Sequence, residues 1–361
     1  MQNELNGLNA KSETSSTAAS ALKGQTLSLD APGVSSRIAE RILKEVDQYC
    51  VQTYDGGHRT HLGASLIGRD CKRYLWYVFR WCLRAATDGR KQRLFNRGHR
   101  EEARFIEWLE GIGFRIWFEN YTGLMHHPES DSYWIQSHEG DEGDGLSNPI
   151  LEDDPYFKSH VARAKIQGVE FPQYRISDCN GHFGGSLDGI AYFPPSWGID
   201  EPVLLEFKTH GTGPKFAKLK ENKMPVEKQE HFAQTSTYGL KYGFRYVLYL
   251  SICKNDDDLH IEVSKLDHNL GGQMIAKAGQ IIGSQTPPPK LSESPTFIDC
   301  RICDMRSICH EGKPIERNCR SCVHATPIEN AQWNCAIHSE ANGPIPKDVI
   351  PLGCESYKAI V

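Results

Sequence analysis

The stretch that decides the fold runs from Gly184 to Lys208 and reads GGSLDGIAYFPPSWGIDEPVLLEFK. Asp188 lies in a glycine-flanked segment typical of a strand, and the apolar run 203–205 leads into Glu206 and Lys208. Because side chains alternate along a strand, Glu206 and Lys208 share one face. If the two segments pair as a hairpin, Asp188 joins them there. Two carboxylates and one ammonium at one point can hold a hard cation through oxygen and place an amine beside a metal-bound water.

Length and composition fit a soluble globular protein of one large domain or two smaller ones. The chain has 361 residues, of which 39% are hydrophobic and 24% charged. A net charge of −5 argues against a protein that coats nucleic acid through bulk charge, but it leaves room for a nuclease with a local basic groove. We see no apolar run long enough to span a membrane and no secretory signal, so we expect a cytoplasmic protein without a membrane partner.

The order of predicted elements indicates an α/β fold of the α+β kind, with a mixed central sheet flanked by helices. Residues 1–34, rich in Ser, Ala and Thr, are expected to be a flexible tail. Helices are predicted over 35–54, 97–111, 226–242 and 266–284, with a helix start at Ser65, and strands over 114–121, 169–177, 182–193, 202–209, 245–253 and 258–264.

An acidic, irregular region separates the first predicted helices from the strand pair. We expect residues 124–160, which include the acidic insertion 139–156, to form an inserted loop. A calcium site at Asp141, Glu142 and Asp144 is the alternative, although the spacing matches no EF-hand loop.

Two further motifs lie on predicted helices on either side of the strand pair. Gly98 and Glu102 form G-x-x-x-E on the upstream helix, where His99 lies one turn before Glu102. Gln234 and Tyr238 form Q-x-x-x-Y on the downstream helix, and their i, i+4 spacing puts both side chains on one face.

Together these motifs resemble the PD-(D/E)xK nuclease superfamily, in its RecB-like and lambda-exonuclease-like branch. The resemblance covers about residues 60–310 and implies a restriction-endonuclease-like core. It implies that Asp188, Glu206 and the backbone carbonyl of Phe207 bind Mg²⁺ or Mn²⁺. Glu102 would serve that ion or a second one, and His99 is a further candidate ligand.

The same resemblance assigns the remaining catalytic residues. Lys208 would position or help to deprotonate the attacking water and balance charge on the phosphate. Gln234 and Tyr238 would orient Lys208 or a phosphate. The partner would be DNA, and the basic residues expected to hold it are Lys72, Arg73, Arg97, Arg100, Lys215, Lys218 and Lys220.

The twelve cysteines point to metal rather than disulfides in a reducing compartment. Cys300, Cys303 and Cys309, with Cys71 far upstream, resemble the pattern of iron–sulfur nucleases, namely the AddB nuclease domain and the CRISPR-associated RecB-like exonucleases. That resemblance implies a [4Fe–4S] cluster that ties the ends of the nuclease domain together. Two alternatives remain open: Cys82 in place of Cys71, and zinc in place of the cluster.

A second cysteine group predicts a small metal-binding module at the C-terminus, held by Zn²⁺. The division would be a nuclease domain over 35–310 and a zinc-binding module over 311–361. The expected ligands are Cys319, Cys322, Cys335 and Cys354, with His324 and His338 as alternates. Cys50, Cys82, Cys179 and Cys253 are expected to be buried apolar residues.

The sequence therefore predicts a metal-dependent deoxyribonuclease. The resemblance favours an exonuclease that acts on DNA ends in recombination or repair, with a single-strand annealing or recombination protein as a further partner. A structure-selective or defence endonuclease is the alternative. Two other classes also fit part of the pattern: a non-catalytic DNA-binding or assembly subunit, and a zinc-ribbon regulator.

Overall fold

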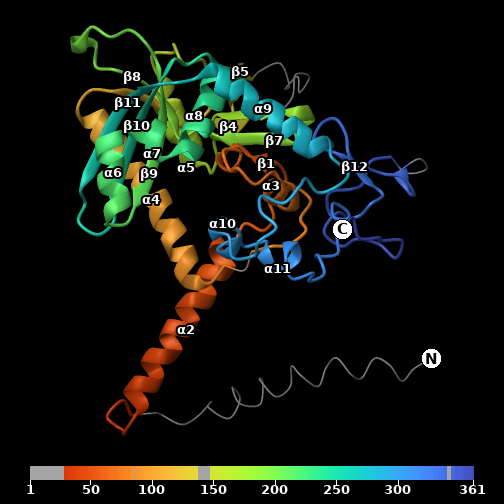
Figure 1. Cartoon of the computed structure of the whole chain (residues 1–361). Helices are drawn as coiled ribbons and strands as arrows, with labels where there is room; N and C mark the ends of the chain where they lie inside the picture. Colours follow the sequence, from red (N-terminus) through yellow and green to blue (C-terminus); the bar gives the residue numbers. More distant parts are fainter. Residues whose placement is uncertain (1–27, 86, 137–146, 340–342) are drawn as a thin grey trace. The chain divides into compact units, whose positions relative to one another are not determined.

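The computed structural model describes residues 28–85, 87–136, 147–339 and 343–361 (Figure 1). The chain divides into two compact units, one of residues 1–55 with 87–94, the other of residues 56–86 with 95–361. Most of the predicted flexible tail and the candidate calcium residues Asp141, Glu142 and Asp144 lie outside the described residues.

The first unit is helical. Its helix α2 (Val34–Tyr54) matches the predicted helix; Val34 and Cys50 are buried, whereas Ile42 and Val46 are exposed. Helix α4 (Gly89–Gly111) begins earlier than predicted, and its residues 89–94 belong to this unit. A Cβ atom at Gly89 would overlap the backbone of Asp47, so the two helices touch here.

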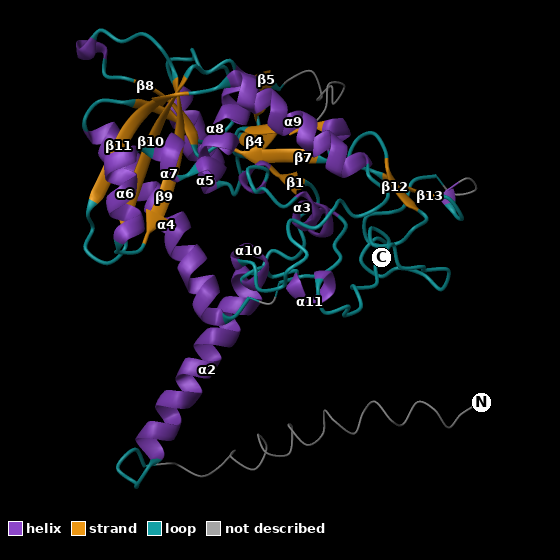
Figure 2. Ribbon diagram, in the orientation of Figure 1, coloured by secondary structure: helices purple, strands orange, loops and turns teal. Residues whose placement is uncertain are grey.

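The second unit is built on a five-stranded mixed sheet in the order β11-β10-β9-β8-β2 (Figure 2). Strands β9 and β10 are parallel and the other neighbours are antiparallel. The fold is α+β, with mixed sheets flanked by helices, as predicted. The strands are β2 (Arg115–Trp117), β8 (Gly189–Tyr192), β9 (Val203–His210), β10 (Tyr246–Cys253) and β11 (Leu259–Lys265).

Alternation along β9 sends its side chains into two different cores. Leu205 and Phe207 pack with Phe105 of α4 on one side of the sheet. Leu204 belongs to the other core, together with Tyr238. Since β9 is covered on both faces, a charged residue in it is buried and needs a partner.

Helices that follow β9 cover the second face. The crossover from β9 to β10 runs through α6 (Pro214–Asn222), α7 (Met224–Glu227) and α8 (Gln229–Tyr242), and α9 (His268–Gly283) follows β11. The predicted helix over 226–242 is thus two helices with a break at Lys228.

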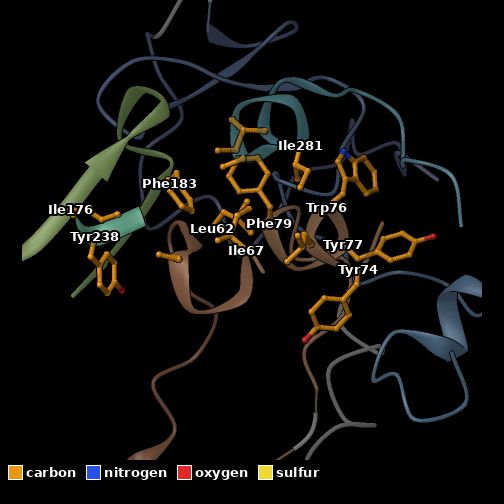
Figure 3. Close-up of a cluster of buried hydrophobic side chains, with 14 of the residues drawn as sticks. Leu62, Ile67, Tyr74, Trp76, Tyr77, Phe79, Ile176, Phe183, Tyr238 and Ile281 are labelled. Carbon is orange, nitrogen blue, oxygen red and sulfur yellow. The ribbon is translucent and has the colours of Figure 1, made fainter. Parts of the chain in front are cut away.

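The largest core gathers residues from distant parts of the chain (Figure 3). Trp76 and Phe79 of α3 (Lys72–Phe79) pack there with Phe183 and Ile281. Trp333 and Ile350 from the C-terminal region belong to the same core. The predicted boundary at residue 310 stays a prediction, but residues on both sides of it share one hydrophobic interior.

The acidic region is more ordered than predicted. Its described parts form β3 (Leu124–His127), β4 (Ser132–Ile135), β5 (Asn148–Pro149) and the start of α5 (Phe157–Ile166). Leu124, Tyr133 and Val161 enclose a small core of their own. The expectation of a loop over 124–160 is therefore wrong for these parts, because regularly placed apolar side chains among the acids give the segment something to bury.

The remaining elements are short. No helix in the described residues is long and apolar enough to cross a membrane. The short strands are β1 (Leu62–Gly63), β6 (Arg175–Asp178), β7 (Phe183–Ser186), β12 (Ala325–Pro327) and β13 (Trp333–Cys335), and the short helices are α10 (Ile298–Arg301), α11 (Arg306–Cys309) and the 3₁₀ turns at 64–66, 179–181 and 195–197.

Candidate active site and cysteine cavities

Asp188 and the charged residues of β9 meet on the central sheet. β8 and β9 pair antiparallel with Gly189 opposite Leu205, so the predicted hairpin is present and Asp188 directly precedes its first strand. The Phe207 amide donates to Asp188 Oδ2 at 2.7 Å. This bond fixes the carboxylate beside the strand that carries Glu206 and Lys208.

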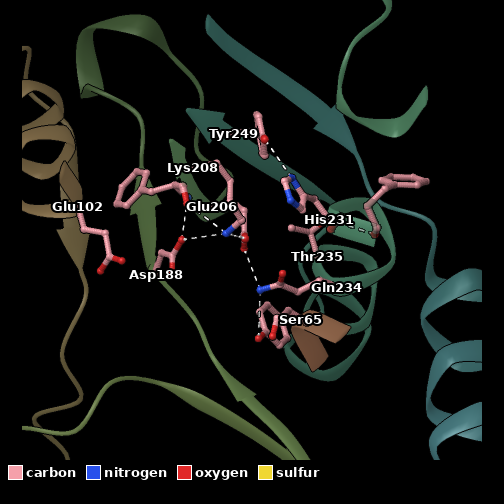
Figure 4. A network of polar contacts seen from close by, with 12 residues as sticks. Ser65, Glu102, Asp188, Glu206, Lys208, His231, Gln234, Thr235 and Tyr249 are labelled. Atoms are coloured by element: carbon pink, nitrogen blue, oxygen red, sulfur yellow. Dashed lines mark hydrogen bonds and ion pairs between the residues drawn. The ribbon is translucent and has the colours of Figure 1, made fainter. Parts of the chain in front are cut away.

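The Lys208 ammonium lies among the three groups that the sequence predicts as metal ligands (Figure 4). It forms a close ion pair with Glu206 Oε1 and lies 4.0 Å from Asp188 Oδ2. It also donates to the Phe207 carbonyl at 3.1 Å. A positive charge therefore already occupies the point where these oxygens converge.

Burial strongly affects the pKa values of Asp188, Glu206 and Lys208. Glu206 is fully buried, and burial raises its pKa to about 7, with Asp188 adding to the shift and Lys208 opposing it. Burial likewise raises the pKa of Asp188, against the pull of Lys208. Burial lowers the pKa of Lys208, but Glu206 and Asp188 outweigh it and the net shift is upward. The amine is therefore protonated.

Helix α4 brings Glu102 and His99 to the same place. Gly98 packs toward Thr209 of β9, with 3.9 Å between a Cβ built at Gly98 and Thr209 Oγ1. The Glu102 carboxylate acts electrostatically on Asp188, Glu206 and Lys208, and Figure 4 shows it beside Asp188. His99 Nδ1 lies 3.3 Å from Glu102 Oε1, and this hydrogen bond raises the pKa of His99.

Helix α8 supplies Gln234 and Tyr238 from the other side of β9. Gln234 Nε2 lies 3.4 Å from Glu206 Oε2 and 3.4 Å from the Tyr238 hydroxyl. The hydrogen bonds of Gln234 thus reach Glu206 and Tyr238, and the predicted role of the pair in orienting Lys208 or a phosphate stays a prediction. Gly185 lies against this tyrosine, because a Cβ atom there would overlap the Tyr238 hydroxyl.

Sequence reasoning missed a polar group beyond Lys208. His210 and His231 both lie within hydrogen-bond distance of the Tyr249 hydroxyl, at 3.3 Å and 3.1 Å. The alternation that aligns Glu206 with Lys208 also puts His210 on that face, so this residue could have been found. Tyr249 and His231 come from other elements, and no spacing rule links them.

The predicted DNA-binding residues lie in separate places. Lys72 and Arg73 are on α3, where Arg73 Nε donates to the Pro288 carbonyl at 2.6 Å and Lys72 Nζ lies 3.3 Å from Gln280 Oε1. Arg97 and Arg100 are on α4, which also carries Glu102, whereas Lys215, Lys218 and Lys220 are on α6. Arg97 donates to the Lys254 carbonyl at 2.9 Å, Lys220 pairs with Asp258 at 2.7 Å, and Arg100, Lys215 and Lys218 are exposed.

The first cysteine quartet lines one small cavity of about 40 Å³, together with Arg73 and Tyr77. Backbone amides donate to two of its sulfurs at 3.4 Å, from Tyr74 to Cys71 and from Met305 to Cys303. Burial raises the pKa of Cys300, with Cys71 and Cys309 as the next causes. All four predicted thiols therefore face the same space.

The second quartet lines another cavity, of about 20 Å³, in which His324 also takes part. Burial raises the pKa of Cys319 to about 11, and the nearby Cys354, Cys335 and Cys322 add to the shift. His338 Nε2 lies 3.9 Å from the Cys354 sulfur. Both predicted alternate ligands are thus close to the thiols.

Neither quartet is arranged as a finished metal site. Among the described residues, no three Cys, His, Asp or Glu side chains lie close enough to hold a metal ion as they stand. Cys82 lines neither cavity; it is buried beside Arg80, Glu316 and Arg320, and burial raises its pKa to about 12. The structure therefore favours Cys71 over Cys82 as the upstream member of the first quartet.

The other cysteines follow the sequence prediction in part. Cys50, Cys82 and Cys253 are buried, whereas Cys179 is half-buried.

Comparisons with known proteins give little. No family model matches the chain, and no curated protein does. Among solved structures the fold is similar to "Crystal structure of SSO0001", at 12% identity over 75% of this chain and 96% of that one, with a TM-score of 0.32. A likeness at that score carries no argument about activity.

Proposed function

We propose that this protein is a metal-dependent deoxyribonuclease whose active site is the carboxylate group around Lys208. One observation carries the proposal. Glu102, Asp188 and Glu206 come from three separate segments, and all three act on one ammonium. A surface ion pair would not bury a glutamate completely or collect three carboxylates about one lysine.

The donor set suits a hard divalent cation. Asp188, Glu206 and the Phe207 carbonyl offer only oxygen, which Mg²⁺ and Mn²⁺ prefer. Glu206 Oε1 is fully buried and has the ammonium as its counter-charge. When bound, such an ion polarises the scissile phosphate and lowers the pKa of its water.

The other residues have supporting roles. Lys208 is protonated and would leave the carboxylates when an ion takes that position, so that its ammonium faces the phosphate and stabilises the negative charge that develops there. This supports charge stabilisation by Lys208 rather than its action as a base. Gln234 holds Glu206 in place, and Glu102 with His99 closes the site from α4.

The cysteine cavities are proposed as structural metal sites. Four thiols, two of which accept hydrogen bonds from backbone amides, suit a [4Fe–4S] cluster in the larger cavity, with Zn²⁺ as the alternative. The smaller cavity, with its neighbouring histidines, suits a single Zn²⁺. Absorption near 400 nm and iron and zinc analysis of anaerobically purified protein distinguish these compositions.

The test of the main proposal is cleavage of DNA by the purified protein. We expect linear DNA to be degraded in Mg²⁺ or Mn²⁺ and spared in EDTA. Asp188→Asn and Lys208→Met should each lower the rate at least about 100-fold, while the exposed Lys265→Met serves as a matched control and leaves it unchanged. Full activity in either active-site variant would contradict the assignment.

The substrate decides the kind of nuclease. Preference for linear over covalently closed circular DNA supports an exonuclease of recombination or repair, and equal cleavage of both supports an endonuclease. Metal-dependent DNA binding without cleavage of either form would favour a non-catalytic subunit.

A further inference from the structure

A second polar group continues the active-site face toward the end of β9. His210 follows Lys208 on the same face, and the two positions are separated by about 6.6 Å along the strand. His210 Nε2 lies 3.3 Å from the Tyr249 hydroxyl and His231 Nδ1 lies 3.1 Å from it. The two imidazole centroids are 6.3 Å apart, and Figure 4 shows His231 joined to the Tyr249 hydroxyl by a dashed line.

His210, Tyr249 and His231 together carry one N–H donor more than their mutual hydrogen bonds use. Tyr249 has one hydroxyl proton, so it donates to one imidazole and accepts from the other. A neutral imidazole that accepts from Tyr249 carries its own proton on the second ring nitrogen. Within the described part of the chain, neither His210 Nδ1 nor His231 Nε2 has a partner of its own. At least one N–H is thus available to a ligand.

Lysines act electrostatically on both rings. The Lys254 amide donates to the His210 carbonyl at 2.8 Å, which holds Lys254 beside His210. Burial lowers the pKa of His210 to about 4, and Lys228, Lys208 and Lys254 lower it further. Burial lowers the pKa of His231 to about 2, with Lys208 as the next cause. Apart from the neighbouring histidines, the groups that act on the two rings are lysines, and an anion bound there would reduce the repulsion between them.

We propose that His210, His231 and Lys228 form a phosphate subsite that holds the phosphodiester next to the scissile one in the DNA strand. The proposal rests on the proposed nuclease function, because Lys208 links this subsite to the carboxylates. The spacing of Lys208 and His210 is comparable with that of successive phosphates in an extended strand. The carboxylates bind a metal cation and this group binds a phosphate anion. The two neighbouring sites therefore hold different parts of the complex of metal ion and DNA.

The subsite positions the strand and does no chemistry. Its residues touch a phosphate that is not cleaved, so their loss should raise KM more than it lowers kcat. Lys228 is half-buried, and its pKa is lowered by burial and by Lys215. Lys215 therefore adds to the positive field from α6.

A chemical double-mutant cycle tests the contact. Single-stranded oligonucleotides carry one neutral methylphosphonate at successive positions around the cleaved bond, and kcat/KM is measured for wild type, Lys228→Met and His231→Gln. In the wild type, a methylphosphonate at one position beside the cleaved bond should lower kcat/KM about tenfold. In either variant, kcat/KM for the unmodified strand should already be lower, and the same methylphosphonate should lower it by less than about a further twofold. Independent, multiplicative losses at every position would overturn the proposal.

A binding measurement tests the phosphate subsite independently of the proposed nuclease function. Fluorescence anisotropy with unmodified single-stranded DNA in EDTA needs no cleavage. Lys228→Met should weaken binding and reduce the slope of log K against log salt by about 0.7, the value for one phosphate contact. Lys265→Met, an exposed lysine on β11, is the matched control and should leave both unchanged. An unaltered slope in Lys228→Met refutes the phosphate subsite, even if the protein cleaves DNA. A reduced slope supports the subsite, even if the protein does not cleave DNA.

Discussion

The carboxylate site and the cysteine cavities are built in different ways. Asp188, Glu206 and Lys208 lie on or beside long, paired strands, and a backbone amide holds Asp188. Among the cysteines, Cys300 and Cys309 lie on four-residue helices, Cys335 ends a three-residue strand, and Cys71 caps the eight-residue α3. Sheet pairing therefore assembles the first site, whereas the short elements around most of the cysteines bury little surface of their own and would depend on the proposed metal groups.

The contrast extends to how each region is anchored. The C-terminal region is held by Arg320, which is fully buried and stacks on Phe79, Trp81 and Trp333 at 4.5–4.7 Å. Its Nη1 also donates to the Thr60 carbonyl at 3.0 Å. Together with Trp333 and Ile350 of the same core, this side chain joins the C-terminal region to the main core.

The largest expected effect is on the free energy of unfolding, and its absence would contradict the contrast between the two regions. Cys303→Ser should lower the free energy of unfolding by about 3 kcal/mol in protein purified with its metal, because the group stabilises only the folded state. Asp188→Asn should change it by less than about 1 kcal/mol, since the sheet holds that site. Chemical denaturation measures both. Cys179→Ser, a half-buried thiol outside both quartets, is the control, and an equal loss in all three variants would contradict the distinction.

A smaller effect is expected where the sheet meets α8. Gly185→Ala places a methyl group on the Tyr238 hydroxyl, so the tyrosine must shift. We expect a loss of about 2 kcal/mol in stability together with weaker metal binding, because Tyr238 lies against Gln234, which contacts Glu206. Gly283→Ala, in open space at the end of α9, is the matched control. Wild-type stability in Gly185→Ala would show that Tyr238 is not held as tightly as the packing indicates.

The pH dependence of metal binding sharpens the same contrast. The pKa of Glu206 is raised to about 7, so its carboxyl group is protonated below that pH and ionised above it. A metal ion binds the ionised form and releases the proton. Mn²⁺ affinity should therefore rise about tenfold per pH unit below 7 and level off above it. A titration that is flat between pH 6 and pH 8 would show that Glu206 does not bind the ion.

The smallest expected effect concerns Gln234. Its amide donates to Glu206 at 3.4 Å, a long bond that favours the ionised carboxylate only modestly. Gln234→Met should weaken Mn²⁺ binding about fivefold and leave stability within about 1 kcal/mol. Calorimetry gives the Mn²⁺ affinity. If Gln234→Met lowers that affinity as much as Asp188→Asn does, Gln234 is itself a metal ligand.

Much of the fold could be predicted, and the failures have physical causes. The helix 35–54 and the strands around 203–210 and 246–253 follow from periodicity. Periodicity shows that a helix such as α2 can form but not which side is covered, and Ile42 and Val46 are exposed. The expectation of a loop over 124–160 is wrong for its ordered parts, because charged residues there hide the apolar positions 124, 133 and 150, which only meet in three dimensions.

By itself, the sequence determined the residue types of the site and their order on β9. Strand alternation is local, so Glu206, Lys208 and His210 had to share a face. Only the tertiary structure decided that α4 and α8 bring Glu102, Gln234 and His231 to that face, because contacts between separate elements depend on packing and pairing that no spacing encodes. The same reason explains why Cys71 and not Cys82 faces the thiols at 300–309.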